Sequence, residues 1–480
     1  MIGTLCISPA GDGQVWAGLR TESLLWREPG VCDWWRRHTL ARLETVAEPS
    51  GNYEIRRFDA VSKDEQGYAE AEKWVKAVAF GFHESFRTPE HVARSLETYR
   101  ADRRVLTGAY QTGEVAPQSL PADVPVATFG TLRKTLNIGF GRMLETQMVT
   151  AVTVRTSHRR RGLLRRMMSE DLDMARRDGI AMAALTASEG SIYGRFGYGV
   201  ASFERTVKVD TTARFQMNHQ AVGTVEVADP KVLLDVAPEI FDRVHRVTPG
   251  SIGRQDWYRQ LASGTLGRDG KEDPAIKVAL RYGADGRVDG YVSYKFLGWD
   301  TEPYTVEVVD LVAATNEGYL ELWQFLAAID LVERVTWAEA PVDDPLPWAL
   351  ADPRCIDSSD SRDMLWLRIL DVRKALEARR YSVDGRLVLE VLDPLGLTAG
   401  TYALEISGGE AAVVPVAPEG DAASADLTLD VSALSSIYLG AVCPVTLAAA
   451  GRIREIAPGE ALRARQMFAV ERAPHCLTHF

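Results

Sequence analysis

Residues 149–202, VTAVTVRTSHRRRGLLRRMMSEDLDMARRDGIAMAALTASEGSIYGRFGYGVAS, contain the pattern that decides the fold. Val152 and Val154 alternate with Thr153, a period of two that is typical of a β-strand. After Gly162 the apolar residues recur at helical spacing. We therefore predict a strand, an Arg-rich turn, a helix, a second buried strand and a Tyr-Gly turn, in that order along the chain.

The Arg-rich turn has the features of a diphosphate site. Arg159, Arg160 and Arg161 precede Gly162, where the missing side chain lets a ligand approach the backbone. Free N–H groups at the start of the next helix, and the positive end of its dipole, attract anions. Taken alone, the arginine run favours a solvated basic face or a nucleic-acid patch, but the flanking strand and Tyr turn favour the diphosphate. No Gly-x-x-x-x-Gly-Lys-Ser/Thr motif occurs, which argues against an NTPase.

Two stretches of this region resemble a known family. The pattern Val-x-Val-x-x-x-x-Arg-Arg-Arg-Gly-Leu-Leu, which ends at Leu164, resembles the acetyl-CoA loop of the GNAT N-acetyltransferases. Residues 187–199, ASEGSIYGRFGYG, resemble the enhanced-intracellular-survival (Eis) branch of actinobacterial GNAT proteins. The usual loop of the superfamily ends in glycine or alanine, and the leucine found here is similar to the Eis branch. The resemblance implies an α/β and α+β fold, with two tandem GNAT-like domains, the second degenerate, followed by a sterol-carrier-protein-like α+β domain.

The resemblance also implies which residues bind acetyl-CoA. The backbone of Val152, Thr153 and Val154 would pair with the pantetheine amides, as an added strand does. Ser188 and Glu189 would lie at the end of the next strand, where two parallel strands splay and the thioester enters. The pyrophosphate would be held by N–H groups and guanidinium side chains of the turn and the helix start: Arg160, Arg161, Gly162, Leu163, Leu164 and Arg165.

Tyr193 is implied to be the general acid. Attack of an amine on a thioester expels a thiolate, and a phenol with a pKa near 10 is still protonated at neutral pH and can donate to it. The alternative for Tyr193, read from the residues alone, is an aromatic plug in a glycine-rich turn.

In Eis-like proteins the base is the carboxylate that ends the chain, which here is that of Phe480. Residues 476–480 are apolar for a tail, which favours docking, although most chain ends are disordered. A carboxylate with a pKa near 3.5 and an alkylammonium near 10.4 differ by roughly 7 units, or about 9 kcal/mol. The carboxylate must therefore be desolvated, act through water, or bind an amine that has already lost its proton. His479 is an alternative base.

The composition is that of a multidomain enzyme. The 480 residues are 46% hydrophobic and 25% charged, enough for about three domains. The net charge of −11 argues against nucleic-acid binding and favours cationic substrates. No apolar run of ~20 residues and no signal peptide is seen, so we expect a cytoplasmic protein without a membrane span. The histidines form no metal motif, so no metal is predicted, and the five cysteines are scattered, as reduced thiols are: Cys6, Cys32, Cys355, Cys443 and Cys476.

The domain organisation that we expect has four parts. Residues 1–50 lie outside the resemblance and are expected to be a poorly ordered extension or an upstream-start artefact. The catalytic GNAT domain would span 51–206, the degenerate GNAT-like domain 207–365, and the sterol-carrier-like domain 366–480. Within them we predict a hairpin around Asp285-Gly286, a helix over 317–333, a helix over 371–379, and hairpins at Asp384-Gly385 and Gly408-Gly409.

The sequence therefore predicts an acetyl-CoA-dependent N-acetyltransferase that acts by direct transfer in a ternary complex. The resemblance implies aminoglycosides, polyamines or peptide lysines as acceptors, and a homohexamer built as a trimer of dimers. The alternatives are a lipid- or sterol-binding protein with a vestigial transferase domain, and a nucleic-acid binder that uses the arginine face. Covalent transfer through a cysteine is a further variant, but the block 187–199 contains no cysteine.

Overall fold

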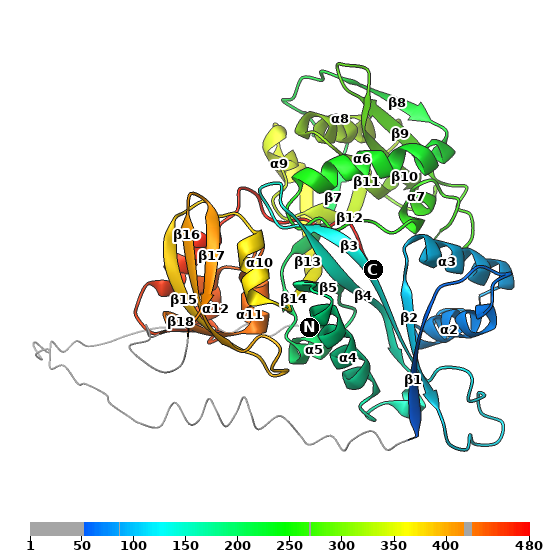
Figure 1. The fold of residues 1–480 in the computed structure, drawn as a ribbon. Helices are drawn as coiled ribbons and strands as arrows, with labels where there is room; N and C mark the ends of the chain where they lie inside the picture. Colours follow the sequence, from blue (N-terminus) through cyan, green and yellow to red (C-terminus); the bar gives the residue numbers. More distant parts are fainter. Residues whose placement is uncertain (1–51, 86, 268–269, 417–424) are drawn as a thin grey trace, which may run out of the picture. The chain divides into compact units, whose positions relative to one another are not determined.

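The structure is a computed structural model that describes residues 52–85, 87–267, 270–416 and 425–480 (Figure 1). The extension expected for residues 1–50 lies outside the described residues. The described residues form three β-sheets of seven, seven and five strands. Within these ranges, every helix is too short or too polar to cross a bilayer.

The first sheet carries the region that decided the sequence prediction. Helix α4 (Leu163–Arg177) follows β4 and contributes its apolar face to the same buried cluster as β4 and β5, as the helical spacing predicts. Helices α2 (Tyr68–Gly81) and α3 (Pro89–Ala101) precede β2. The strands, in their order across the sheet, are β1 (Tyr53–Asp59), β2 (Val105–Gln111), β3 (Ala127–Asn137), β4 (Met143–Val154), β5 (Met182–Thr186), β14 (Leu365–Ile369) and β6 (Gly199–Val200).

Strands β4 and β5 are parallel but pair over three residues only. The last pair joins Met148 to Ala184, whereas β4 runs on to Val154 and β5 to Thr186. Beyond this pair the two strands diverge, which leaves a row of backbone groups of β4 without a neighbouring strand on that side. The resemblance noted in the sequence implies an opening of this kind between two parallel strands.

The second sheet repeats this plan. Its two parallel strands also pair over three residues, from Thr305–Arg334 to Glu307–Thr336. The predicted hairpin around Asp285-Gly286 is confirmed, because it joins two antiparallel strands. The sheet order is β13 (Ile356–Asp363), β7 (Phe203–Asp210), β12 (Arg334–Pro341), β11 (Thr305–Ala313), β10 (Val288–Phe296), β9 (Lys277–Tyr282) and β8 (Thr224–Ala228), with helices α6 (Leu233–Val247), α7 (Trp257–Ala262), α8 (Asn316–Ala327) and α9 (Leu346–Ala349).

The helix predicted over 317–333 is too long, because α8 ends at Ala327. Strand β12 begins at Arg334, so residues 328–333 must turn the chain back to the sheet. Leu331 takes a positive φ of 66° within that turn. Ile329 lies in this turn but packs against the same buried core as the helix, and for that reason it continues the apolar spacing of the helix.

Two strands exchange between the first two sheets. β7 follows β6 directly along the chain but pairs with β12 and β13 in the second sheet. β14 follows β13 but pairs with β5 and β6 in the first sheet. The boundary expected between residues 365 and 366 therefore falls at the start of a strand that belongs to the first sheet.

The third sheet, whose strands are orange in Figure 1, follows α10 (Val372–Ala378), which confirms the helix predicted over 371–379 and has Asp371 as its cap. The hairpin at Gly408-Gly409 is confirmed, since it joins β16 to β17. The hairpin at Asp384-Gly385 is wrong: the element before it is α10, which offers no strand for β15 to pair with. The sheet order is β17 (Glu410–Pro415), β16 (Gly400–Ser407), β15 (Gly385–Leu392), β18 (Leu427–Asp430) and β19 (Ile453–Glu455), with α11 (Val431–Ile437), α12 (Pro444–Ala449) and α13 (Glu460–Met467).

The glycine-rich block 187–199 packs directly against α11, a helix of the region that contains the third sheet. A Cβ atom on Gly199 would lie 1.9 Å from the carbonyl oxygen of Ser432 in α11. That contact is to backbone, which cannot move aside as a flexible side chain could. The close approach of α11 to β6 thus requires glycine at position 199.

We expect Gly199→Ala to lower the free energy of unfolding by about 1–3 kcal/mol, because the added methyl group must push β6 and α11 apart. Gly194→Ala is the matched control in the same block, since a Cβ there meets no atom within 4 Å and Gly194 already has helical φ and ψ. Chemical unfolding of the two variants measures the difference. Equal stability of Gly199→Ala and the unchanged protein would refute the close contact.

Candidate active site

Most of the residues predicted to bind acetyl-CoA, together with the residue predicted as the acid, lie at one cavity. It has a volume of about 770 Å³ and lies between the C-terminal end of α2 with its following loop, β4, the start of α4, and α5 (Gly190–Tyr193). Seven of the residues singled out from the sequence line it: Val152, Thr153, Val154, Leu164, Ser188, Glu189 and Tyr193.

A β-bulge turns the end of β4 toward this cavity. The register with β3 shifts between Thr128 and Gly130, and Ala151 opposite has a φ of 51°. One extra residue on β4 bends the strand at this point, as bulges do. The hydroxyl groups of Thr128 and Thr153 lie 2.7 Å apart and hold the strand beyond the bulge to its neighbour. Residues 152–154 lie beyond this bulge and beyond the last residue pair of β4 with β5.

The Arg-rich turn produces a helix start with free donors. Gly162 precedes α4 with a φ of 75°, in the left-handed region that favours glycine, and Arg160 has a φ of 62°. The N–H groups of the first turn, Leu163 to Arg165, have no carbonyl partner within the helix. No side chain caps this end of α4. A phosphate oxygen is the kind of acceptor that such a helix start binds.

The residues of the Arg-rich turn differ in whether they reach the cavity. Arg161 donates to the hydroxyl of Tyr53 at 2.6 Å and to the carbonyl of Ser157 at 3.2 Å, so its side chain holds the turn together. The predicted residues Arg160, Arg161, Gly162, Leu163 and Arg165 do not line the cavity, whereas Arg159 and Arg155 do. The last two are absent from the sequence-based prediction, although Arg159 belongs to the same basic run.

Tyr193 ends the one-turn helix α5, and only 7% of its surface is exposed. Its ring lies edge-on to that of Tyr198, with centroids 6.2 Å apart. Burial raises the pKa of Tyr193 above its ordinary value, and the charge of Glu189 adds to the shift. The phenol therefore remains protonated at neutral pH and can donate a proton into the cavity.

The end of the chain docks at the first sheet. The hydroxyl of Thr186 donates to a carboxylate oxygen of Phe480 at 2.5 Å and accepts from the Phe480 N–H at 3.2 Å. Thr186 is the last residue of β5, two residues before Ser188. The Phe480 side chain packs against a buried cluster that includes Met148 and Ala184. The apolar tail is thus docked rather than frayed, as its composition favours.

His479, the alternative base, faces the second sheet. Its Nε2 lies 3.5 Å from Glu204 and 3.6 Å from Glu339, and it lines a second cavity of about 700 Å³. That cavity also has Glu272 and Glu307 in its wall. His479 is therefore engaged with two carboxylates on the side of the tail toward the second sheet.

Several residues at the site carry no clear sequence signal. Thr186 is an ordinary strand end until Phe480, 294 positions later, is found beside it. The last turn of α2 contributes Phe80, and the loop after it contributes Phe82 with the polar side chains His83 and Glu84; Phe80 and Phe82 are 53% and 43% exposed. Exposed aromatic residues beside a cavity are a common sign of a binding site, but only the structure brings them to β4.

Comparison with known proteins agrees with this geometry. Models described as acetyltransferase (GNAT) domains match residues 66–201 and 250–369, and a sterol carrier protein domain model matches residues 372–477. The fold and the site therefore define an N-acetyltransferase with two GNAT domains followed by a sterol carrier protein domain.

The relatives specify the branch. An uncharacterized N-acetyltransferase of Streptomyces avermitilis is 34% identical over 417 residues, which is 85% of this chain and 96% of the relative. N-acetyltransferase Eis of Mycobacterium bovis is 35% identical over 360 residues, 73% of this chain and 82% of the relative. The crystal structure of Eis1 from Mycobacterium abscessus superposes with a TM-score of 0.73 at 27% identity, over 89% of this chain and 100% of that chain. The chain belongs to the Eis family of GNAT N-acetyltransferases.

Proposed function

We propose that this N-acetyltransferase transfers the acetyl group of acetyl-CoA directly to an amine. The observation that carries the proposal is the single cavity lined by the open edge of β4, the start of α4 and Tyr193. Pantetheine amides pair with the backbone of residues 152–154, and the pyrophosphate binds the N–H groups of residues 163–165 with Arg159 and Arg160 beside them. The thioester then lies between Ser188 and Tyr193.

The reaction needs one proton donor and one acceptor. The amine nitrogen attacks the thioester carbon, the carbon–sulfur bond breaks, and the leaving thiolate takes the Tyr193 proton. The proton lost by the amine passes to the carboxylate of Phe480, directly or through water. We propose no covalent enzyme intermediate.

The contact with Thr186 defines how the carboxylate acts. A hydrogen bond donated to the charged form of a carboxylate lowers its pKa, which makes it a weaker base. We infer that the carboxylate of Phe480 binds and orients an amine that has already lost a proton, and accepts the remaining proton only as the nitrogen becomes positive during attack.

The acceptor is proposed to be a polycation: an aminoglycoside, a polyamine or a peptide lysine. The net charge of the chain is −11, and four carboxylates line the cavity next to His479, against Lys295 and Arg362. We also propose a cytoplasmic homohexamer, a trimer of dimers, as the working form.

Thiol release from acetyl-CoA tests this function directly. The protein is assayed with polyamines, aminoglycosides and lysine peptides, and the acetylated product is identified by mass. We expect one thiol per acetylated amine and no release without an acceptor. Thiol release that does not depend on any amine would refute direct transfer.

Thr186→Val should lower kcat about tenfold, because the carboxylate loses its donor and a misplacement of ~1 Å is costly. Thr131→Val, a buried threonine of β3, is the control. A Thr186→Val variant with full turnover would exclude a role for this contact.

A further inference from the structure

The last residues of the chain are held from both sides, and the second side has no role in the proposed function. Thr186 of the first sheet binds Phe480. Residues 249–258, which end in the first turn of α7, contact the part of the tail that precedes Phe480. The N–H of His475 donates to the carbonyl of Pro249 at 2.8 Å, and the Thr478 hydroxyl donates to the carbonyl of Ile252 at 3.0 Å.

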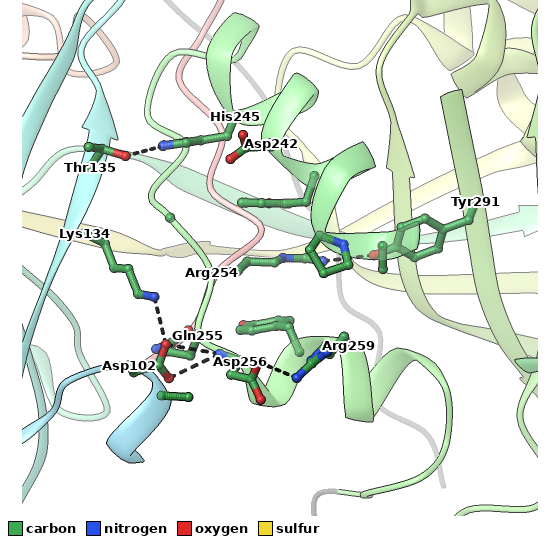
Figure 2. A pocket seen from close by; sticks show the side chains of 16 residues that line it. Asp102, Lys134, Thr135, Asp242, His245, Arg254, Gln255, Asp256, Arg259 and Tyr291 are labelled. Atoms are coloured by element: carbon green, nitrogen blue, oxygen red, sulfur yellow. Dashed lines mark hydrogen bonds and ion pairs between the residues drawn. The ribbon is translucent and has the colours of Figure 1, made fainter. Parts of the chain in front are cut away.

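Arg254 is the most strongly anchored residue of this segment. Its guanidinium forms a two-point pair with Asp310, at 2.7 and 2.8 Å, and both side chains are buried. The rings of Phe241 and Tyr258 each lie 4.4 Å from its central carbon. Figure 2 shows this side chain in the wall of a separate pocket of about 370 Å³, where it points toward Tyr291 and donates to the Tyr291 hydroxyl at 3.2 Å. Such a planar cation, fixed by a carboxylate and two rings, has little freedom to move.

Arg254 also binds the backbone of the tail. The same Nη2 atom that contacts Asp310 donates to the carbonyl of Leu477 at 3.1 Å. Leu477 lies three residues before the end of the chain, so the guanidinium fixes the backbone just before the terminal carboxylate.

Tyr258 fixes the next peptide unit. Its hydroxyl accepts from the N–H of His479 at 2.6 Å and donates to the carbonyl of His479 at 3.2 Å. Burial raises the pKa of Tyr258, so the hydroxyl keeps the proton that it donates. One hydroxyl thus binds both backbone groups of the penultimate residue, while its ring supports Arg254.

We propose that Arg254 and Tyr258 of the second GNAT domain are positioning residues that hold the terminal carboxylate of the chain at the active site. The inference rests on the proposed function, in which that carboxylate receives the acceptor amine. Chain ends otherwise fray, and a carboxylate at the end of a frayed tail would sample many positions. The second domain, which the sequence predicts to be a degenerate GNAT-like domain, would in this way take part in catalysis.

Two readouts separate holding the tail from catalysis. Digestion with a carboxypeptidase releases the terminal phenylalanine at a rate that reports how often the tail opens, whether or not the enzyme turns over. Steady-state kinetics then report kcat and the KM for acetyl-CoA. Tyr258→Phe is the main variant, because it removes only the hydroxyl and keeps the ring beside Arg254. Arg254→Lys is the second, because it keeps the charge opposite Asp310 but loses the forked geometry.

We expect Tyr258→Phe to release Phe480 about tenfold faster and to lower kcat about tenfold, with the KM for acetyl-CoA unchanged. Tyr294→Phe is the matched control, a buried tyrosine of the second domain that packs against Phe325. In a chain that lacks Phe480 the same Tyr258→Phe change should lower kcat by less than about twofold, because the group that it positions has already gone.

The possible results distinguish the failure of each idea. Unchanged phenylalanine release in both Tyr258→Phe and Arg254→Lys would overturn the clamp. An equal loss of kcat with and without Phe480 would also overturn it, since the hydroxyl would then act through the fold. Faster release with full turnover would overturn the role of the terminal carboxylate, and with it the positioning role. If the wild type acetylates no amine, the proposed function fails, and the release rates still decide whether the tail is held.

Discussion

Tyr193→Phe is expected to lower kcat by roughly 100-fold or more while acetyl-CoA affinity stays nearly constant. The variant keeps the ring that fills the space beside Tyr198 and loses only the proton that the leaving thiolate needs. Calorimetric titration with acetyl-CoA and the thiol-release assay measure the two quantities separately.

The pH dependence of the wild type follows from the same residue. Burial, with Glu189, raises the pKa of Tyr193 above its ordinary value near 10, so the acid stays protonated while the neutral fraction of the amine grows up to about pH 10. We expect turnover to rise with pH and to show no alkaline decline below about pH 10.

Tyr198→Phe is the matched control for Tyr193→Phe. Tyr198 lies in the same glycine-rich block and is buried, with its hydroxyl 3.9 Å from the sulfur of Met168. Its turnover should match that of the unchanged protein. Full activity in Tyr193→Phe would show that the thiolate is protonated by another donor.

Moving the terminal carboxylate should have an effect of similar size. A chain extended by one glycine past Phe480, or shortened by that residue, is expected to lose roughly 100-fold or more in kcat. In the extended chain a peptide carbonyl, which is far less basic, replaces the carboxylate beside Thr186. Acetyl-CoA affinity should change little.

Phe480→Leu is the control for this change. It keeps the carboxylate and an apolar side chain at the end of the chain, so its turnover should stay within a few-fold of that of the wild type. Normal activity in the extended chain would show that the carboxylate is not the group that receives the amine, even if Tyr193 remains the acid.

Local patterns in the sequence were sufficient for much of the fold. Helix α4, the hairpin at Asp285-Gly286 and helix α10 depend on neighbours within a few residues, and all were predicted. The errors arise where tertiary structure overrides the local pattern. Residues 328–333 continue a helical spacing but must turn toward β12, and Asp384-Gly385 has turn residues but no strand before it.

The candidate site was predictable where the residues adjoin one another along the chain. The run through Gly162 and the block around Tyr193 share one cavity because β4, α4 and β5 are consecutive elements. The contacts of the tail could not be predicted in the same way. Thr186, Arg254 and Tyr258 are common residue types whose partners lie more than 200 positions away, so no local pattern marks them.

The close packing of the glycine-rich block has a similar origin. From the sequence, Gly199 belongs to a turn that accompanies Tyr193. In the structure it meets the backbone of α11, so one block serves both the site and the contact with the third sheet. Gly199, which is needed for close packing, thus lies only a few positions from Tyr193, which is proposed as the acid.

A crystal structure of the protein with bound coenzyme A tests the central claim most directly. We predict that the pyrophosphate lies on the N–H groups of residues 163–165 and that the sulfur lies within about 3.5 Å of the Tyr193 hydroxyl, which is hydrogen-bonding range for sulfur. Coenzyme A bound elsewhere, or with its sulfur directed away from Tyr193, would contradict it.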